Sequence, residues 1–103
     1  MVNDAAVFRA LADPTRRQIL QYLKGQELAA GEIVERLPIS GPSVSRHLAI
    51  LKSAGLLHER RDGNRIFYSL DADRLALTIS DFVSAVCPAQ ISLRRQVRRR
   101  TVS

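Results

Sequence analysis

The sequence predicts a winged helix-turn-helix, a mainly α (α+β) fold with the element order α-α-α-α-β-β-α. Two short helical patterns, one over about residues 30–37 and one from about residue 41, are joined by only three residues, as in a helix-turn-helix. After Gly55 the apolar spacing changes from the helical period to alternation around Asp62-Gly63, which predicts a β-hairpin. A further amphipathic pattern over about 71–87 predicts a last helix after the hairpin.

Composition and charge limit what the chain can be. With 103 residues, 46% hydrophobic residues and 25% charged residues, the chain fits one small globular domain. Residues 1–88 hold 11 Lys and Arg against 10 Asp and Glu, whereas residues 89–103 hold 5 Arg and no acid. We therefore expect a nearly neutral domain over 1–88 and a basic C-terminal tail over 89–103, which suits nucleic acid or another anionic surface.

The cellular location follows from features that the sequence lacks. Cys87 is the only cysteine, so an internal disulfide framework is excluded, which suits a reducing cytosol. No apolar run approaches the roughly 20 residues of a membrane span. The N-terminus has no basic region followed by an apolar block, so we expect no signal peptide and a cytoplasmic protein.

The boundaries of the helices are marked by capping residues. The first pattern, over residues 5–12, stops before Asp13 and Pro14. Asp13 suits the N-cap of a second helix, and Pro14 suits the first turn of that helix, which runs to about residue 25. Pro38 ends the third helix, and Ser40 or the glycine after it can cap the fourth.

The hairpin has two different faces. A two-residue loop at Asp62-Gly63 would be a type I′ turn. That register places Arg60 opposite Arg65, and like charges facing each other across strands are destabilising without an anion nearby. We therefore expect a wing that straddles a phosphate backbone. The opposite face should point inward and carries Leu57, Ile66, Tyr68 and Leu70.

The fourth helix carries the surface that the sequence predicts to meet DNA. With Val44 at the centre of its buried side, Arg46 and Ser53 point directly away, and the stretch 40–57 contains no acid. Small side chains allow the helix to approach DNA closely. Arg can pair with guanine, and an apolar side chain can contact a thymine methyl group. The candidate DNA-binding residues are Ser40, Pro42, Ser43, Ser45, Arg46, His47 and Ile50 on this helix, Arg60, Arg61, Asn64 and Arg65 on the hairpin, and Thr15 and Arg16 on the second helix.

His47 has two competing interpretations. It lies at the edge of the buried face, about 60° from Val44 at the helical period. A hydrogen-bonded packing histidine is the favoured interpretation, a phosphate contact is the second, and a metal ligand is the least favoured.

Three motifs in order resemble the ArsR/SmtB family of bacterial winged-helix repressors. FRALADPTRRQIL is similar to the opening of that family, SVSRHLAILKSAGLL to its recognition helix, and RRDGNRIFYSL to its wing. The match spans about residues 5–86, and within the family the chain is most similar to the SdpR-like subgroup. The resemblance implies a homodimer that represses transcription from an inverted-repeat operator and is released by an inducer. It places the dimer interface on the first and last helices, at Phe8, Leu11, Leu75, Ile79, Phe82, Val83 and Val86.

The chain departs from the family's sensor patterns. Ala29, Ala30 and Gly31 stand where arsenic and cadmium sensors of the family have Cys-Val-Cys, and residues 71–87 contain no histidine where zinc and cobalt sensors have ligands. Soft and borderline metals need clusters of Cys or His. We therefore expect no metal site and no cofactor. The family often has Gln where this chain has Gly41 and Arg where it has Asn64, so those two contacts are lost or altered.

Two alternatives to a DNA-binding repressor without a metal sensor remain open. One is a winged-helix module used for protein–protein assembly, which the acid-free helix face and the wing arginines argue against. The other is a thiol-responsive regulator that uses Cys87, although a passive buried thiol is the favoured interpretation of that residue. An enzyme is not expected, because no nucleophile–base set, carboxylate pair or Gly-rich phosphate loop is present.

Overall fold

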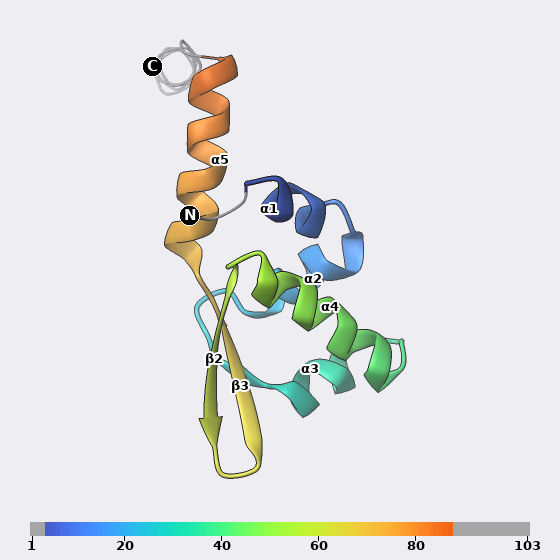
Figure 1. Cartoon of the computed structure of the whole chain (residues 1–103). Helices are drawn as coiled ribbons and strands as arrows, with labels where there is room; N and C mark the ends of the chain where they lie inside the picture. The colour runs from blue at the N-terminus through green and yellow to red at the C-terminus, as the bar shows by residue number, and fades with distance from the viewer. Residues whose placement is uncertain (1–3, 88–103) are drawn as a thin grey trace, which may run out of the picture.

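Helices and short strands follow one another along residues 4–87, the part of the chain that this computed structural model describes (Figure 1). The predicted winged helix-turn-helix is confirmed, with one additional short strand before the third helix. The predicted tail over 89–103 lies outside the described residues. The elements are α1 Asp4–Leu11, α2 Pro14–Tyr22, β1 Leu28–Ala29, α3 Ala30–Arg36, α4 Gly41–Ser53, β2 Leu57–Asp62, β3 Arg65–Leu70 and α5 Ala72–Val86.

Polar side chains cap the starts of α2 and α4 as the sequence predicts. The carboxylate of Asp13 accepts hydrogen bonds from the backbone N–H groups of Thr15 (2.8 Å) and Arg16 (3.2 Å), with Pro14 in the first turn. The Ser40 hydroxyl accepts from a backbone N–H at the start of α4. These caps satisfy donors that have no partner inside a helix, so they fix where α2 and α4 begin.

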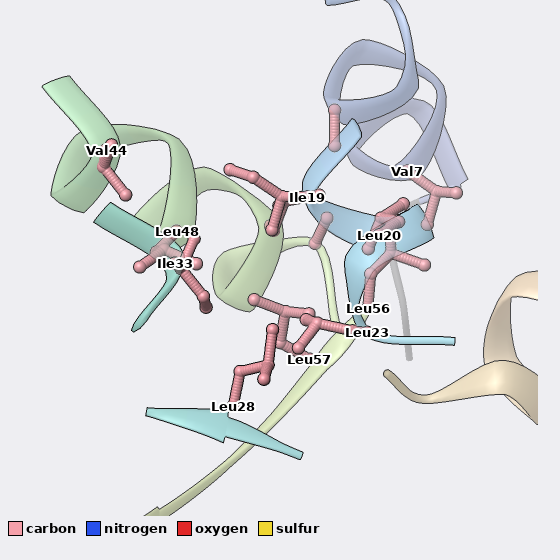
Figure 2. Close-up of a cluster of buried hydrophobic side chains, with 13 residues drawn as sticks. Val7, Ile19, Leu20, Leu23, Leu28, Ile33, Val44, Leu48, Leu56 and Leu57 are labelled. Atoms are coloured by element: carbon pink, nitrogen blue, oxygen red, sulfur yellow. The ribbon is translucent and has the colours of Figure 1, made fainter. Parts of the chain in front are cut away.

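The core lies where α1, α2, α3 and α4 meet the start of β2 (Figure 2). The buried side of α4 is the predicted one, with Val44, Leu48 and Leu51 all inside. Each buried aliphatic side chain of this size stabilises the fold by about 1.5–3 kcal/mol relative to its exposed state. The largest fully buried side chains are Ile19, Leu23, Ile33, Leu51, Leu56, Val7 and Val44.

The sheet has three strands in the order β1-β3-β2, all antiparallel. β1 is two residues long and pairs with β3, with Leu28 opposite Tyr68 and Ala29 opposite Phe67. The sequence prediction missed β1, because two residues are too few to show strand alternation. Through its pairing with β3, β1 connects the hairpin to the segment that leads into α3.

The predicted register of the hairpin is wrong. Asp62 pairs with Arg65, so the two-residue loop is Gly63-Asn64, one residue later than predicted. Gly63 has φ +62°, whereas Asn64 does not have a positive φ, a pattern that fits a type II′ turn and excludes type I′. Arg60 therefore lies opposite Phe67 and not opposite Arg65. Each strand residue keeps its face, and Leu57, Tyr68 and Leu70 pack on the core as expected.

α5 projects from the rest of the fold (Figure 1), and much of its apolar surface is uncovered. Phe82 is 53% exposed, although its ring meets that of Phe8 edge-on at 5.3 Å between centroids. Leu77 and Val86 are more exposed still. Cys87, which follows α5 directly, is exposed, so the expectation of a buried thiol is wrong for the single chain. None of the helices within residues 4–87 is long and apolar enough to span a bilayer.

Candidate nucleic-acid interface

The outer face of α4 is an exposed surface without acidic groups. Arg46, Ala49 and Ser53 are exposed, and Ile50 is 37% exposed. Within residues 4–87, the guanidinium of Arg46 has no hydrogen bond and no ion pair. A long cation held on a capped helix with small neighbours is free to reach a base edge in the major groove.

The N-terminal turn of α4 is ordered by its own serines. The Ser40 hydroxyl donates to the Ser43 hydroxyl at 2.9 Å and accepts from the Ser43 N–H at 3.3 Å. Pro42 and Ser45 are exposed beside them. A pre-formed helix N-terminus offers backbone donors to a phosphate.

Arg16 makes contacts with two neighbouring helices. Its Nε donates to the Ala10 carbonyl (2.8 Å) and its Nη2 to the Arg9 carbonyl (2.9 Å), both at the end of α1. Its Nη1 lies 3.3 Å from Nδ1 of His47 on α4. A guanidinium can only donate, so Nδ1 is the acceptor in this contact. His47 is thus a half-buried, hydrogen-bonded histidine, in agreement with the favoured interpretation.

Carboxylates hold the arginines of the wing, which is the hairpin β2–β3. Arg60 binds Glu27 with two parallel hydrogen bonds, Nη2 to Oε1 at 2.7 Å and Nε to Oε2 at 3.1 Å. The hydrogen bond from Arg60 lowers the pKa of Glu27 below its ordinary value and outweighs the opposing effect of desolvation. Arg60 thus has a carboxylate partner of its own and, in the observed register, does not stand directly opposite Arg65.

The remaining wing cations are also paired. Arg65 lies 3.6 Å from Glu32, and Arg61 lies 3.7 Å from Glu59. Glu59 is held more closely by Lys52 at 2.8 Å, and that bond is the main reason that the pKa of Glu59 is lowered. Asn64, at the tip of the wing, is exposed. The wing thus presents cations whose charge is partly balanced by nearby acids.

Glu27 and Glu32 contact the arginines of the wing, and sequence reasoning missed both. Glu27 directly precedes β1, and Glu32, in the first turn of α3, also accepts from the Ala29 N–H at 3.1 Å. Their contact with the wing depends on the pairing of β1 with β3. The only available signal was their position next to an unrecognised strand.

The two positions where sensors of the family have thiolate ligands differ in exposure. Ala29 is buried, whereas a Cβ atom added at Gly31 would meet nothing within 4 Å. Across the described residues, no three His, Cys, Asp or Glu side chains lie together in a way that could hold a metal ion.

An exposed, acid-free second helix of a helix-turn-helix, with an arginine-bearing wing beside it, defines a winged-helix DNA-binding protein. A helix-turn-helix domain model matches residues 11–60. The transcriptional repressor SdpR of Bacillus subtilis is 49% identical over 74 residues, which cover 72% of this chain and 82% of SdpR. The repressor SmtB of Mycobacterium tuberculosis is 39% identical over 85 residues, and the match covers 81% of this chain and 63% of SmtB.

Solved structures agree with the sequence matches. An ArsR-like transcriptional regulator from Rhodococcus sp. RHA1 superposes with a TM-score of 0.72 and 29% identity, over 91% of each chain. The chain belongs to the ArsR/SmtB family of winged helix-turn-helix transcriptional regulators.

Proposed function

We propose that the chain is a cytoplasmic transcriptional repressor that binds an inverted-repeat operator as a homodimer and senses no metal. The observation that carries this proposal is the outer face of α4, where Arg46 is exposed and has no counter-ion within residues 4–87. Among related proteins, SdpR is named a transcriptional repressor, which favours repression over activation.

The uncovered face of α5 supports the homodimer. Leu75 packs against the core, while Ile79 and Val83 are half-buried and Phe82 and Val86 are exposed. Covering such side chains contributes about 25 cal/mol per Å² of apolar surface. A second copy of the same helix is the simplest cover, and together with Phe8 and Leu11 it completes the proposed dimer interface.

The proposed contacts divide into base and backbone roles. Arg46, Ser45 and Ile50 face the base edges, while Ser40, Pro42 and Ser43 bring the helix N-terminus to a phosphate. On the wing, Arg61, Asn64 and Arg65 are proposed to contact phosphates. In a dimer, two copies of α4 read half-sites about 34–36 Å apart or a multiple of that spacing.

Thr15, Arg16, His47 and Arg60 have structural uses beside any contact with DNA. The Thr15 N–H is used by Asp13, and Arg16 and His47 bind each other. Arg60 is held by Glu27. We propose that Arg16 and His47 orient α4 and that Arg60 orients the wing, whereas Thr15 contributes its backbone N–H to the cap of α2.

Selection from a randomised duplex library tests the proposal. Wild-type protein should enrich an inverted repeat. Arg46→Ala should cost about 1–3 kcal/mol and relax the preference at one base position in each half-site. Lys24→Ala, which removes an exposed cation in the loop after α2, should keep the preference at every position. A reporter gene carrying the selected sequence should fall in expression when the protein is present.

Other outcomes point elsewhere. A uniform loss of affinity in Arg46→Ala, with no change in preference, would assign Arg46 to a phosphate and move base reading to Ser43, Ser45 or Ile50. Recovery of no preferred sequence by the wild-type protein would favour the protein–protein assembly module.

A further inference from the structure

A concave pocket of about 310 Å³ lies between α1 and α4. Ala6 and Arg9 of α1 line one side of it. The other side consists of the outward residues of α4, which are Arg46, Ala49, Ile50 and Ser53, with Ala54 directly after the helix. α1 and α4 are in contact, and the lining residues Ala49, Ile50 and Ser53 lie in the C-terminal half of α4. The pocket therefore shares Arg46 and Ile50 with the proposed DNA-binding face.

The walls of the pocket are mostly aliphatic, and its charged groups are both arginines. Ala6, Ala49 and Ile50 supply apolar surface, and no acidic residue lines the pocket. Within the described part of the chain, neither the Arg9 side chain nor the Arg46 side chain has a hydrogen bond or an ion pair. The wing arginines, by contrast, all face carboxylates. These two guanidinium groups thus stand free beside an apolar hollow.

This combination fits a small molecule with an apolar body and a carboxylate head. The volume is at the lower end of the range for small-molecule sites, which are typically apolar with a few placed polar groups. A guanidinium is the side chain best suited to a carboxylate, because it can donate two parallel hydrogen bonds. We propose that the pocket between α1 and α4 binds a small amphipathic carboxylate, with Arg9 and Arg46 on the carboxylate and Ala6, Ala49 and Ile50 on the apolar body.

The proposed dimer leaves this pocket open. At about 100° per residue, Ala6 and Arg9 lie on the side of α1 roughly opposite to Phe8 and Leu11. Phe8 contacts Phe82 of α5, so the dimer forms on that other side. A second copy of the chain therefore does not cover the pocket.

Binding of the carboxylate and binding of DNA exclude each other, because both use Arg46 and Ile50. This consequence rests on the proposed function, whereas occupancy of the pocket does not. For mutually exclusive binding, a ligand at ten times its own Kd weakens DNA binding about elevenfold.

Calorimetric titration of the full chain without DNA tests the pocket directly. The probes are hexanoate, octanoate and decanoate below their aggregation limits, with decanol and decylammonium as matched controls for the head group. Affinity should rise about two- to fourfold per added methylene, as expected for partial to full burial. Decanol and decylammonium should bind at least tenfold more weakly than decanoate.

Arg9→Gln separates the pocket from the DNA-binding face. Arg9 has no assigned role on DNA, and only its backbone carbonyl bonds Arg16, so the substitution should keep the fold and change DNA affinity less than twofold. It should lower decanoate affinity at least fivefold. Arg36→Gln is the control, since Arg36 lies 5.5 Å from the Tyr22 ring and does not line the pocket.

Each result decides the proposal. Equal binding of decanoate and decylammonium, or equal decanoate affinity in Arg9→Gln and Arg36→Gln, would overturn the carboxylate site. If decanoate binds in an Arg9-dependent way and weakens DNA binding by the competitive factor, the proposal stands in full. If decanoate binds in an Arg9-dependent way but leaves DNA affinity unchanged, the carboxylate site in the pocket is supported. Mutually exclusive binding of decanoate and DNA would then be overturned, and so would the placement of Arg46 on DNA.

Discussion

At the scale of single residues, Phe67 is the centre of the outer face of the wing. The guanidinium of Arg60 lies 4.4 Å from the centre of its ring, and that of Arg65 lies 4.9 Å from it. Both arginines also reach a carboxylate, Glu27 and Glu32 respectively. Stacking and ion pairing together restrict both guanidinium groups in the single chain, so the proposed contact of the wing with phosphates would need less side-chain ordering.

Glu27 and a DNA phosphate are expected to compete for Arg60. In Glu27→Gln, Arg60 loses its bidentate counter-ion and keeps only Asp62, whose Oδ2 lies 4.0 Å from Nη1, so the guanidinium becomes more available to a phosphate. We expect tighter binding to all duplexes alike at low salt, because phosphates carry no sequence information. The slope of log K against log salt should steepen by about 0.9 for the one added contact.

Glu35→Gln is the matched control for this effect. It removes the same charge from an exposed position on α3. Equal slopes in the two variants would show that Arg60 acts only within the wing.

At the scale of elements, the junction of α1, α2 and α4 depends on one short segment. Asp13 caps α2, and Arg16 binds the last carbonyls of α1 and the ring of His47 on α4. Carbonyls at a helix C-terminus lack partners inside the helix, so a cation there is stabilising. The orientation of α4 is thus set from the start of α2.

The Asp13 cap predicts acid sensitivity. Desolvation alone would raise the pKa of Asp13, but hydrogen bonds from the Arg16 and Thr15 backbone hold it below its ordinary value of 3.8. Stability from this carboxylate is therefore present above pH 3.8 and is lost as pH falls through the lower folded-state pKa. Asp13→Asn keeps a cap and should flatten the fall in melting temperature below about pH 4. Asp13→Ala should lower the melting temperature by about 2–8 °C at pH 7.

Calorimetry across pH measures both variants of Asp13. A wild-type melting temperature that falls below pH 4 as steeply as that of Asp13→Asn would show that other carboxylates dominate acid unfolding.

The elements differ in how far the sequence predicted them. Helix starts were predictable, since Asp13 and Ser40 act within three residues of their own position. The outer face of α4 was predictable for the same reason, because helical geometry is local. The hairpin loop was placed one residue early, since both Asp62-Gly63 and Gly63-Asn64 are good turn pairs.

Contacts between distant residues were not predictable. Glu27 and Arg60 are 33 residues apart and meet through a strand too short to recognise. The pocket between α1 and α4 likewise needs the packing of two helices, which no single stretch of sequence specifies.

At the scale of the whole molecule, α5 is the element that the single chain leaves incomplete. α5 is amphipathic, and one side of it carries the predicted apolar stripe. Phe8 of α1 extends that stripe through its contact with Phe82. The exposed apolar surface is therefore continuous between the first and last helices, which is the arrangement expected for a two-fold interface.

The dimer prediction compares carboxylates on the apolar stripe of α5 with a carboxylate on its opposite side. Phe82→Asp combined with Ile79→Asp puts carboxylates on the apolar stripe and should give monomers in light scattering at micromolar concentration. Ser84→Asp, on an exposed part of α5 away from the stripe, should stay dimeric.

Because two linked half-site contacts gain avidity of about 10²–10⁴ over one, the monomeric variant should bind a full operator at least 100-fold more weakly. Its affinity for an isolated half-site should be unchanged, since α4 and the wing are intact. A wild-type protein that is monomeric at micromolar concentration would refute the stable homodimer, and the operator would then have to be read by single chains.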